Sequence, residues 1–319
     1  MSAASPREVP GRARIGIALA LGLASTALCY LRLAGGGVLA ADFTWAWRGA
    51  QLLITGQNPY ALILPAGAYP FNDFLYYPLP ALLIAMPFTW LSGPTAGAIF
   101  IGVSSGLLCW GLLREGTQRL ILFASPPYLY ALITAQWSPL ITAAALLPNL
   151  AFALSAKPNL GLAVLVAYPE RRRLLLFGAA VAASLLVLPS WPADMLGRIS
   201  SHHNFTPLIS WYGPLLLLAL PFWRAPSARL LLALAIMPQR LLYDQLPLWL
   251  IPQTPRQSLL LTIASWAGVL LGLALGWGEA ALVSAYLPAL GCVLWGRRAQ
   301  IRAWVRRKGG GHPDAAADG

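Results

Sequence analysis

Long apolar runs, separated by short polar or proline-rich stretches, form the main pattern along this chain. Residues 15–33, 95–113 and 257–275 are each long enough to cross a bilayer, which takes about 20 residues of α-helix. The run 174–188 shows none of the alternation between apolar and polar residues that a barrel strand requires. The pattern therefore predicts an all-α membrane protein.

Shorter apolar runs complicate the number of crossings. Further runs cover residues 120–134, 174–188, 207–222 and 280–295. The region 138–168 holds three runs that are each too short for a standard crossing, and we interpret them as tilted or partial crossings. One long helix plus a half-helix is the alternative. We expect a polytopic transmembrane bundle of about 10–12 spans, whose external first loop carries juxtamembrane helices at the outer leaflet, around residues 79–91.

The distribution of charge adds a topology to this prediction and leaves the predicted class, an all-α membrane protein, unchanged. The chain is 58% hydrophobic and 10% charged with a net charge of +12, and its basic residues gather at the ends and in short loops. This distribution follows the positive-inside rule rather than the basic face of a nucleic-acid-binding protein. It predicts a plasma-membrane protein with both termini in the cytoplasm: a basic N-terminus (residues 1–14), a transmembrane domain (15–296) and a basic, partly disordered tail (297–319) that contacts membrane lipids.

The cysteines give no sign of a metal or redox centre. Cys29, Cys109 and Cys292 all lie in apolar runs, and the sequence contains no CxxC motif. We therefore expect no metal and no cofactor.

With this topology, polar and aromatic residues from distant segments meet on the external side. They are Asp42, Asn58, Tyr60, Asp73, Tyr76, Tyr77, Gln136, Lys157, His202, His203, Asn204, Arg240 and Asp244. Asp42 follows the first apolar run closely, and the chain has only ten acidic residues. The sequence shows no internal repeat, so an inverted-repeat transporter is not favoured.

The ordered motifs on this face resemble those of the GT-C membrane glycosyltransferases, most of all glycosyltransferase family 87. The motifs are Asp42-Phe43, Gly56-Gln-Asn-Pro-Tyr60, Tyr76-Tyr-Pro-Leu-Pro80, Ala135-Gln-Trp-Ser-Pro-Leu140, Lys157-Pro-Asn159 and Tyr243-Asp244. The resemblance runs from about residue 15 to residue 255. That family transfers mannose from a polyprenyl-phosphate donor.

The resemblance implies a role for each polar residue. Asp42 takes the place of the family's catalytic aspartate in the first external loop. Lys157, His202 or His203, and Arg240 would hold the donor phosphate. Contacts to the sugar or to the acceptor would come from Asn58, Tyr60, Tyr76, Tyr77, Gln136, Asn204 and Asp244. The acceptor would be a lipid-linked or cell-envelope glycan, and transfer would invert the sugar configuration.

Elementary chemistry is compatible with these roles. A carboxylate close to a helix end can take a proton from an acceptor hydroxyl, and cationic side chains can stabilise a departing phosphate without a metal. Each residue also has a simpler interpretation. Asp42 could be a helix cap, Lys157 could extend to the membrane interface, and Arg240 and Asp244 could pair with each other. Asp73 and Asp194 are expected to be solvated loop acids.

Two other functions remain open from the sequence. A transporter or flippase of a lipid-linked precursor would need polar residues near the bilayer midplane. An inactive relative that acts as an assembly partner is favoured by the short runs in region 138–168.

Overall fold

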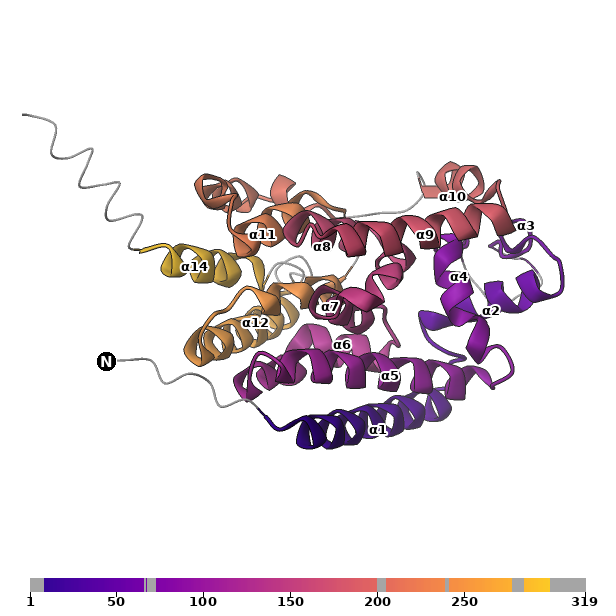
Figure 1. The fold of residues 1–319 in the computed structure, drawn as a ribbon, viewed down its shortest axis with the longest axis horizontal. Helices are drawn as coiled ribbons and strands as arrows, with labels where there is room; N and C mark the ends of the chain where they lie inside the picture. Colours follow the sequence, from indigo (N-terminus) through magenta and orange to yellow (C-terminus); the bar gives the residue numbers. More distant parts are fainter. Residues whose placement is uncertain are drawn as a thin grey trace, which may run out of the picture.

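The structure, a computed structural model, describes residues 9–65, 67, 73–199, 205–238, 241–276 and 284–298. Over these residues the fold is helical and contains no β-strand (Figure 1), as the sequence predicts. The N-terminal part contains α1 (Gly11–Gly35), α2 (Phe43–Ile54), α3 (Pro59–Leu62), α4 (Leu79–Ala85), the 3-10 helix η1 (Met86–Phe88) and α5 (Gly93–Leu113). The middle contains η2 (Thr117–Ala124), α6 (Pro126–Ile133), α7 (Ser138–Leu146), η3 (Pro148–Ala156), α8 (Pro158–Ala167), α9 (Arg171–Val187) and α10 (Trp191–Ile199). The C-terminal part contains η4 (Pro207–Ile209), η5 (Gly213–Phe222), α11 (Pro226–Ile236), η6 (Leu242–Leu250), α12 (Pro255–Leu275) and α14 (Tyr286–Gly296).

Few of these helices could cross a membrane unaided. Among the described residues, α1, α5 and α12 are long and apolar enough, and a fourth span results if α9 and α10, bent by 98°, are counted together. Five shorter apolar helices accompany them. The fold therefore has the character of a membrane protein, while the expected count of about ten to twelve spans stays a prediction.

Glycines bring α1 and α5 into close antiparallel contact (Figure 1). A Cβ added at Gly102 would lie 1.8 Å from the Thr26 hydroxyl oxygen and 2.8 Å from the Gly22 carbonyl oxygen. One turn along, a Cβ at Gly106 would lie 3.2 Å from the Ala18 carbonyl oxygen. Small residues four apart permit such backbone approach between membrane helices, so this seam forms one wall of the bundle.

Proline divides two segments that the sequence pattern predicts as single helices. The apolar run 120–134 breaks at Ser125, where η2 ends and Pro126-Pro127 begin α6. The run 207–222 is likewise divided into η4 and η5, and Pro214 lies in the first turn of η5. Proline supplies no N–H donor and is tolerated mainly in a first helical turn, so both predictions of an unbroken helix were wrong.

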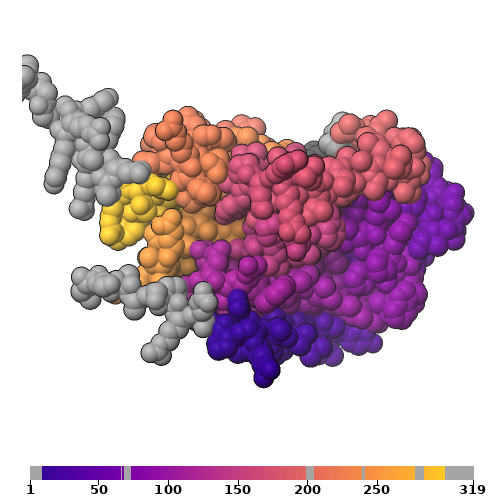
Figure 2. All heavy atoms as spheres, in the orientation of Figure 1, coloured from indigo at the N-terminus to yellow at the C-terminus, as the bar shows by residue number. Residues whose placement is uncertain are grey.

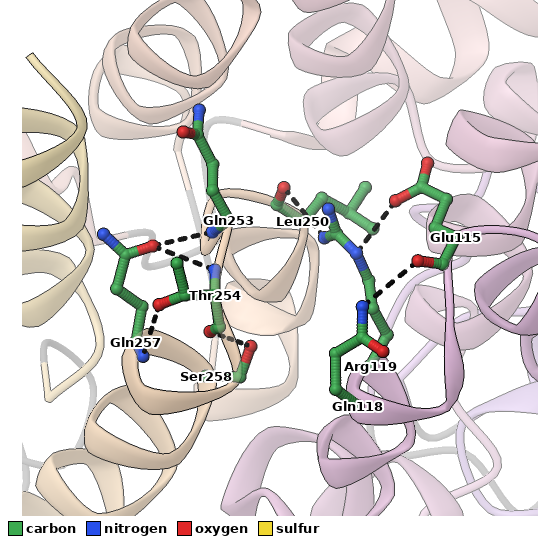
Figure 3. A network of polar contacts seen from close by, with 8 residues as sticks. All are labelled: Glu115, Gln118, Arg119, Leu250, Gln253, Thr254, Gln257 and Ser258. Carbon is green, nitrogen blue, oxygen red and sulfur yellow. Dashed lines mark hydrogen bonds and ion pairs between the residues drawn. The ribbon is translucent and has the colours of Figure 1, made fainter. Parts of the chain in front are cut away.

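A polar network lies between the start of η2 and the entry to α12 (Figure 3). Arg119 pairs with Glu115 at 2.9 Å and donates to the Leu250 carbonyl oxygen at 3.3 Å. Next to it, Thr254 and Gln257 form a reciprocal capping box at the start of α12. The network holds together segments that are more than a hundred residues apart in sequence.

The short helices α2, α3, α4 and α10 gather at one end of the molecule, on the right in Figure 1. The sharp bend after α9 carries α10 over this group, and Figure 2 shows its atoms against those of the α2–α4 region. Aromatic packing joins the group to the bundle, since the Phe43 ring stacks on the Phe100 ring of α5 at 4.1 Å. This end of the fold, called the cap below, carries the first predicted site residue, Asp42.

Candidate functional site

Asp42 lies where α1 and the cap meet, and its backbone is held on both sides. Before it, Leu39 and Ala40 pack against the α5 glycines Gly93 and Gly97. At Asp42 itself, the backbone N–H donates to the Thr134 carbonyl oxygen at 3.0 Å. The contacts with α5 therefore end at Ala40, two residues before Asp42, and the bond to Thr134 fixes the Asp42 backbone.

Two alanines beside the predicted residues have backbone angles that alanine rarely adopts. Ala41, directly before Asp42, has φ of 48°, and Ala135, directly before Gln136, has φ of 46°. A left-handed conformation costs a residue with a Cβ about 1–2 kcal/mol. Such outliers concentrate at functional sites, because the surrounding structure holds them there against their preference.

The segment after Ala135 buries polar groups for which the described residues supply no hydrogen-bond partner. Both amide atoms of Gln136, the Trp137 indole nitrogen and the Ser138 hydroxyl belong to this set. The Trp137 ring packs 5.8 Å from the Phe43 ring and 6.0 Å from the Tyr77 ring, measured between centroids. Gln136 is thus fully buried beside Trp137, and its predicted contact with substrate stays a prediction.

A cavity of about 260 Å³ opens between the cap and the segments that contain Lys157 and Tyr243. It contains four of the predicted site residues: Tyr76, Tyr77, Lys157 and Asp244. Most of the remaining wall is apolar or aromatic, formed by Trp45, Phe74, Pro78, Ala156, Pro158, Met195, Pro238 and Tyr243 with the amide of Asn159. A hollow with apolar walls and a few convergent polar groups is the usual form of a small-molecule site.

The charged group in this cavity is a buried ion pair. The Lys157 ammonium lies 2.5 Å from an Asp244 carboxylate oxygen, and their side chains are 13% and 0% exposed. The ammonium also lies over the Tyr243 ring, 4.5 Å from its centroid. The interpretation of Lys157 as a lysine that extends to the membrane interface is therefore wrong.

Tyr243 connects this pair to the predicted base. Its hydroxyl donates to the Asp42 carboxylate at 3.3 Å, and its ring stacks on Tyr130 at 5.7 Å between centroids. Asp42 occupies the N-cap position of α2, yet its side chain accepts no hydrogen bond from that helix. The simple capping interpretation of Asp42 is therefore wrong, because the carboxylate points to another element.

Asn58 and Tyr60 hold the cap together and lie outside the cavity wall. The Asn58 side chain accepts from the Tyr60 N–H at 2.9 Å and so caps α3, while the buried Tyr60 hydroxyl donates to the Tyr77 carbonyl oxygen at 2.8 Å. Burial raises the pKa of Tyr60 well above its ordinary value, and nearby Asp194 adds to the effect while Arg198 opposes it. Their predicted contact with substrate is untested, and what the structure assigns them is support of Tyr77.

Asp73 and Asp194 were predicted to be solvated loop acids, but both accept hydrogen bonds from other side chains. Asp194 lies on α10, half-buried, where it accepts from the Ser190 hydroxyl at 2.9 Å and from the Asn58 amide at 3.4 Å. Asp73 accepts from the Tyr76 hydroxyl at 2.6 Å. Within the described residues, no three His, Cys, Asp or Glu side chains come together as a metal site would require.

Four predicted residues lie outside the described residues: His202, His203, Asn204 and Arg240. The pair expected between Arg240 and Asp244 is therefore untested. Sequence reasoning assigned no role to Tyr243, although it stands directly before Asp244 in a quoted motif. Trp45 and Met195 were also missed as wall residues, because aromatic and apolar side chains are common throughout a membrane protein.

Comparison with known proteins adds no assignment to this geometry. The chain matches no family model. It matches no curated protein and no solved structure either. The case for a function therefore rests on the cap cavity and on the residues that meet there.

Proposed function

We propose that this protein is a membrane-embedded inverting glycosyltransferase that moves a sugar, mannose as the first candidate, from a polyprenyl-phosphate donor to a lipid-linked or cell-envelope glycan. One observation carries the proposal: Tyr243 joins Asp42 to the cavity that contains Lys157, with its hydroxyl 3.3 Å from the carboxylate and its ring 4.5 Å from the ammonium. A carboxylate base and a cation for phosphate are the two groups that the reaction needs.

The reaction balances with these two groups alone. An acceptor hydroxyl attacks the anomeric carbon, and its proton passes to the Asp42 carboxylate. The bond between the anomeric carbon and the phosphate oxygen breaks with its electron pair on oxygen, and the polyprenyl phosphate leaves with one added negative charge. Lys157, which lines the cavity, would stabilise that charge. The largely apolar wall would keep out the water that competes with the acceptor.

The membrane character of the fold supports a lipid-linked donor. A polyprenyl chain dissolved in the bilayer would lie among the three long apolar helices and the shorter ones, and in this proposal it reaches the cap. In the arrangement we propose, the shorter helices complete about ten to twelve tilted or partial crossings in the plasma membrane. Both termini then lie in the cytoplasm, and the cap faces outward.

Sugar transfer by the purified protein tests the proposal. Polyprenyl-phosphate-mannose and a total lipid extract would be incubated with the wild type, with Asp42→Asn and with Glu115→Gln, all with a metal chelator present. We expect a new glycolipid from the wild type and from Glu115→Gln, whose carboxylate belongs to the network at η2, and none from Asp42→Asn. Equal product from Asp42→Asn would exclude Asp42 as the base.

An inactive relative is the second candidate, and one contact favours it. The ammonium expected to bind phosphate is already neutralised by Asp244. If the wild type transfers none of several sugars from polyprenyl-phosphate donors, and an active transferase co-purifies with it, this candidate replaces the first.

A further inference from the structure

Two consecutive residues of η6 hold two groups that are far apart in the sequence. Tyr243 donates to Asp42, which lies 201 residues earlier, and Asp244 pairs with Lys157, which lies 87 residues earlier. Both η6 residues are buried, at 2% and 0% exposure. The spacing between the carboxylate and the ammonium therefore depends on one turn of 3-10 helix.

Tyr243 contributes two separable contacts. Its hydroxyl donates to Asp42, and its ring lies beneath the Lys157 ammonium. A donated hydrogen bond favours the ionised carboxylate and holds it in one orientation. A cation over the ring interacts with its negative face and draws electron density from the phenol, which makes the O–H a stronger donor.

The remaining contacts keep this tyrosine in one orientation. Tyr130 of α6 stacks on its ring with the two planes 26° apart. Asp244 pairs with the ammonium and so restrains Lys157 beside the ring. The Asp42 backbone is fixed separately by Thr134. All three groups are therefore held before any ligand arrives, which is how a preorganised site is built.

We propose that Tyr243 is the positioning residue of this site: it orients the Asp42 carboxylate and links its charge to the Lys157 ammonium. The inference rests on the proposed function for its kinetic part, but not for the contact itself. Two substitutions at Tyr243 remove different contacts and should therefore have different effects. Tyr243→Phe keeps the ring and removes the hydroxyl, whereas Tyr243→Leu removes both contacts.

Chemical labelling tests the contact without any assumption about activity. A water-soluble carbodiimide reacts with protonated carboxyl groups, so the extent of Asp42 labelling as a function of pH, read by mass spectrometry, reports when this residue ionises. In Tyr243→Phe we expect the labelling curve to move by about one pH unit to higher pH, because the ionised form loses a donor. Tyr128→Phe is the matched control, since it removes a buried hydroxyl that bonds to Ser25 and Ser105 instead.

Kinetics then tests the consequence. In Tyr243→Phe we expect kcat to fall about tenfold with little change in the donor KM, because only the base is affected. Tyr243→Leu should also raise the donor KM, because the ammonium loses the ring. A labelling curve that moves in a protein without transfer activity would uphold the positioning role and reject the proposed function. An unmoved curve in Tyr243→Phe would overturn the positioning role, whatever the activity.

Discussion

Two regions of this chain differ in how they are built: the seam between α1 and α5, and the site around Asp42, Lys157 and Tyr243, called the cap site below. The seam consists of glycines and other small residues in direct backbone contact, and α1 buries only a narrow stripe against it, formed by Ala18, Gly22, Ser25, Cys29 and Leu33. The cap site instead contains two left-handed alanines, a buried ion pair and buried polar atoms without a partner among the described residues.

The seam contributes stability to the fold, whereas the cap site contains features that lower stability and that the rest of the fold must hold in place. Close packing of small residues is favourable for membrane helices in itself. A strained backbone and a desolvated charge are unfavourable unless their surroundings compensate for them. The seam ends at Leu39 and Ala40, just before Ala41 and Asp42, so the stable region directly supports the unfavourable one.

Breaking the buried ion pair should give the largest change in stability of the tests of this comparison. Lys157→Met leaves the Asp244 carboxylate buried without its lysine, and we expect the free energy of unfolding to fall by about 3 kcal/mol. Chemical unfolding in detergent would measure it. The double variant Lys157→Met/Asp244→Leu should recover most of the loss, since both charges are gone. Glu115→Gln, at a pair whose carboxylate is half exposed, should cost less than about 1 kcal/mol.

The next test disturbs the seam. Gly102→Ala places a methyl group against Thr26 and the Gly22 carbonyl, and we expect it to lower the free energy of unfolding by about 2 kcal/mol, because two backbones must separate. Gly16→Ala on α1 meets nothing within 4 Å and is the matched control. It should be neutral or slightly stabilising, since alanine favours a helix over glycine. Equal losses in both variants would mean that the seam is not close-packed.

The next test should have a smaller effect, and it predicts a gain in stability rather than a loss. Gln136→Met keeps the length of the side chain and removes both buried amide atoms, so we expect the ligand-free protein to become more stable by about 1 kcal/mol. If transfer activity falls at the same time, the amide serves a ligand rather than the fold. A loss of stability would instead show that a partner outside the described residues satisfies this amide. Thermal unfolding beside an activity assay distinguishes these results.

The smallest test concerns the support of the cap. Tyr60→Phe removes the bond to the Tyr77 carbonyl and should cost about 1 kcal/mol at neutral pH. Burial raises the pKa of Tyr60, so its contribution to stability is complete below the ordinary phenol value of 10.0 and is lost as pH rises above it. The advantage of the wild type should therefore shrink above pH 10. Unfolding measured from pH 8 to pH 11 would show it, and a constant difference would contradict it.

The sequence predicts the long helices closely. Residues 15–33, 95–113 and 257–275 correspond to α1, α5 and α12 with ends that differ by only a few residues, because length and composition alone define a helix in lipid. The breaks at Pro126 and Pro214 do not follow from apolar content, because a run can stay apolar on average while a proline interrupts its helix.

The site could be predicted only in part. Asp42, Lys157 and Asp244 were selected as polar residues of one face, and the structure joins all three through Tyr243. Which of them would touch depends on how η6 packs against α6 and α7, and a linear pattern does not contain that. The left-handed conformations of Ala41 and Ala135 were equally hidden, since alanine gives no local signal for them.

The seam also has a consequence for biogenesis. Synthesis delivers α1 before α5, and most of the apolar α1 surface stays exposed in the fold, so α1 depends little on packing against other helices. In the topology that we propose, the segment from Gly36 to Ser92, which includes most of the cap, would lie across the membrane before α5 is made. When α5 is made, its glycines pack against Ala18, Gly22 and Ala40, and that contact fixes the second end of the segment. Assembly of the cap cavity comes later still, because Lys157, Tyr243 and Asp244 all follow α5 in the chain.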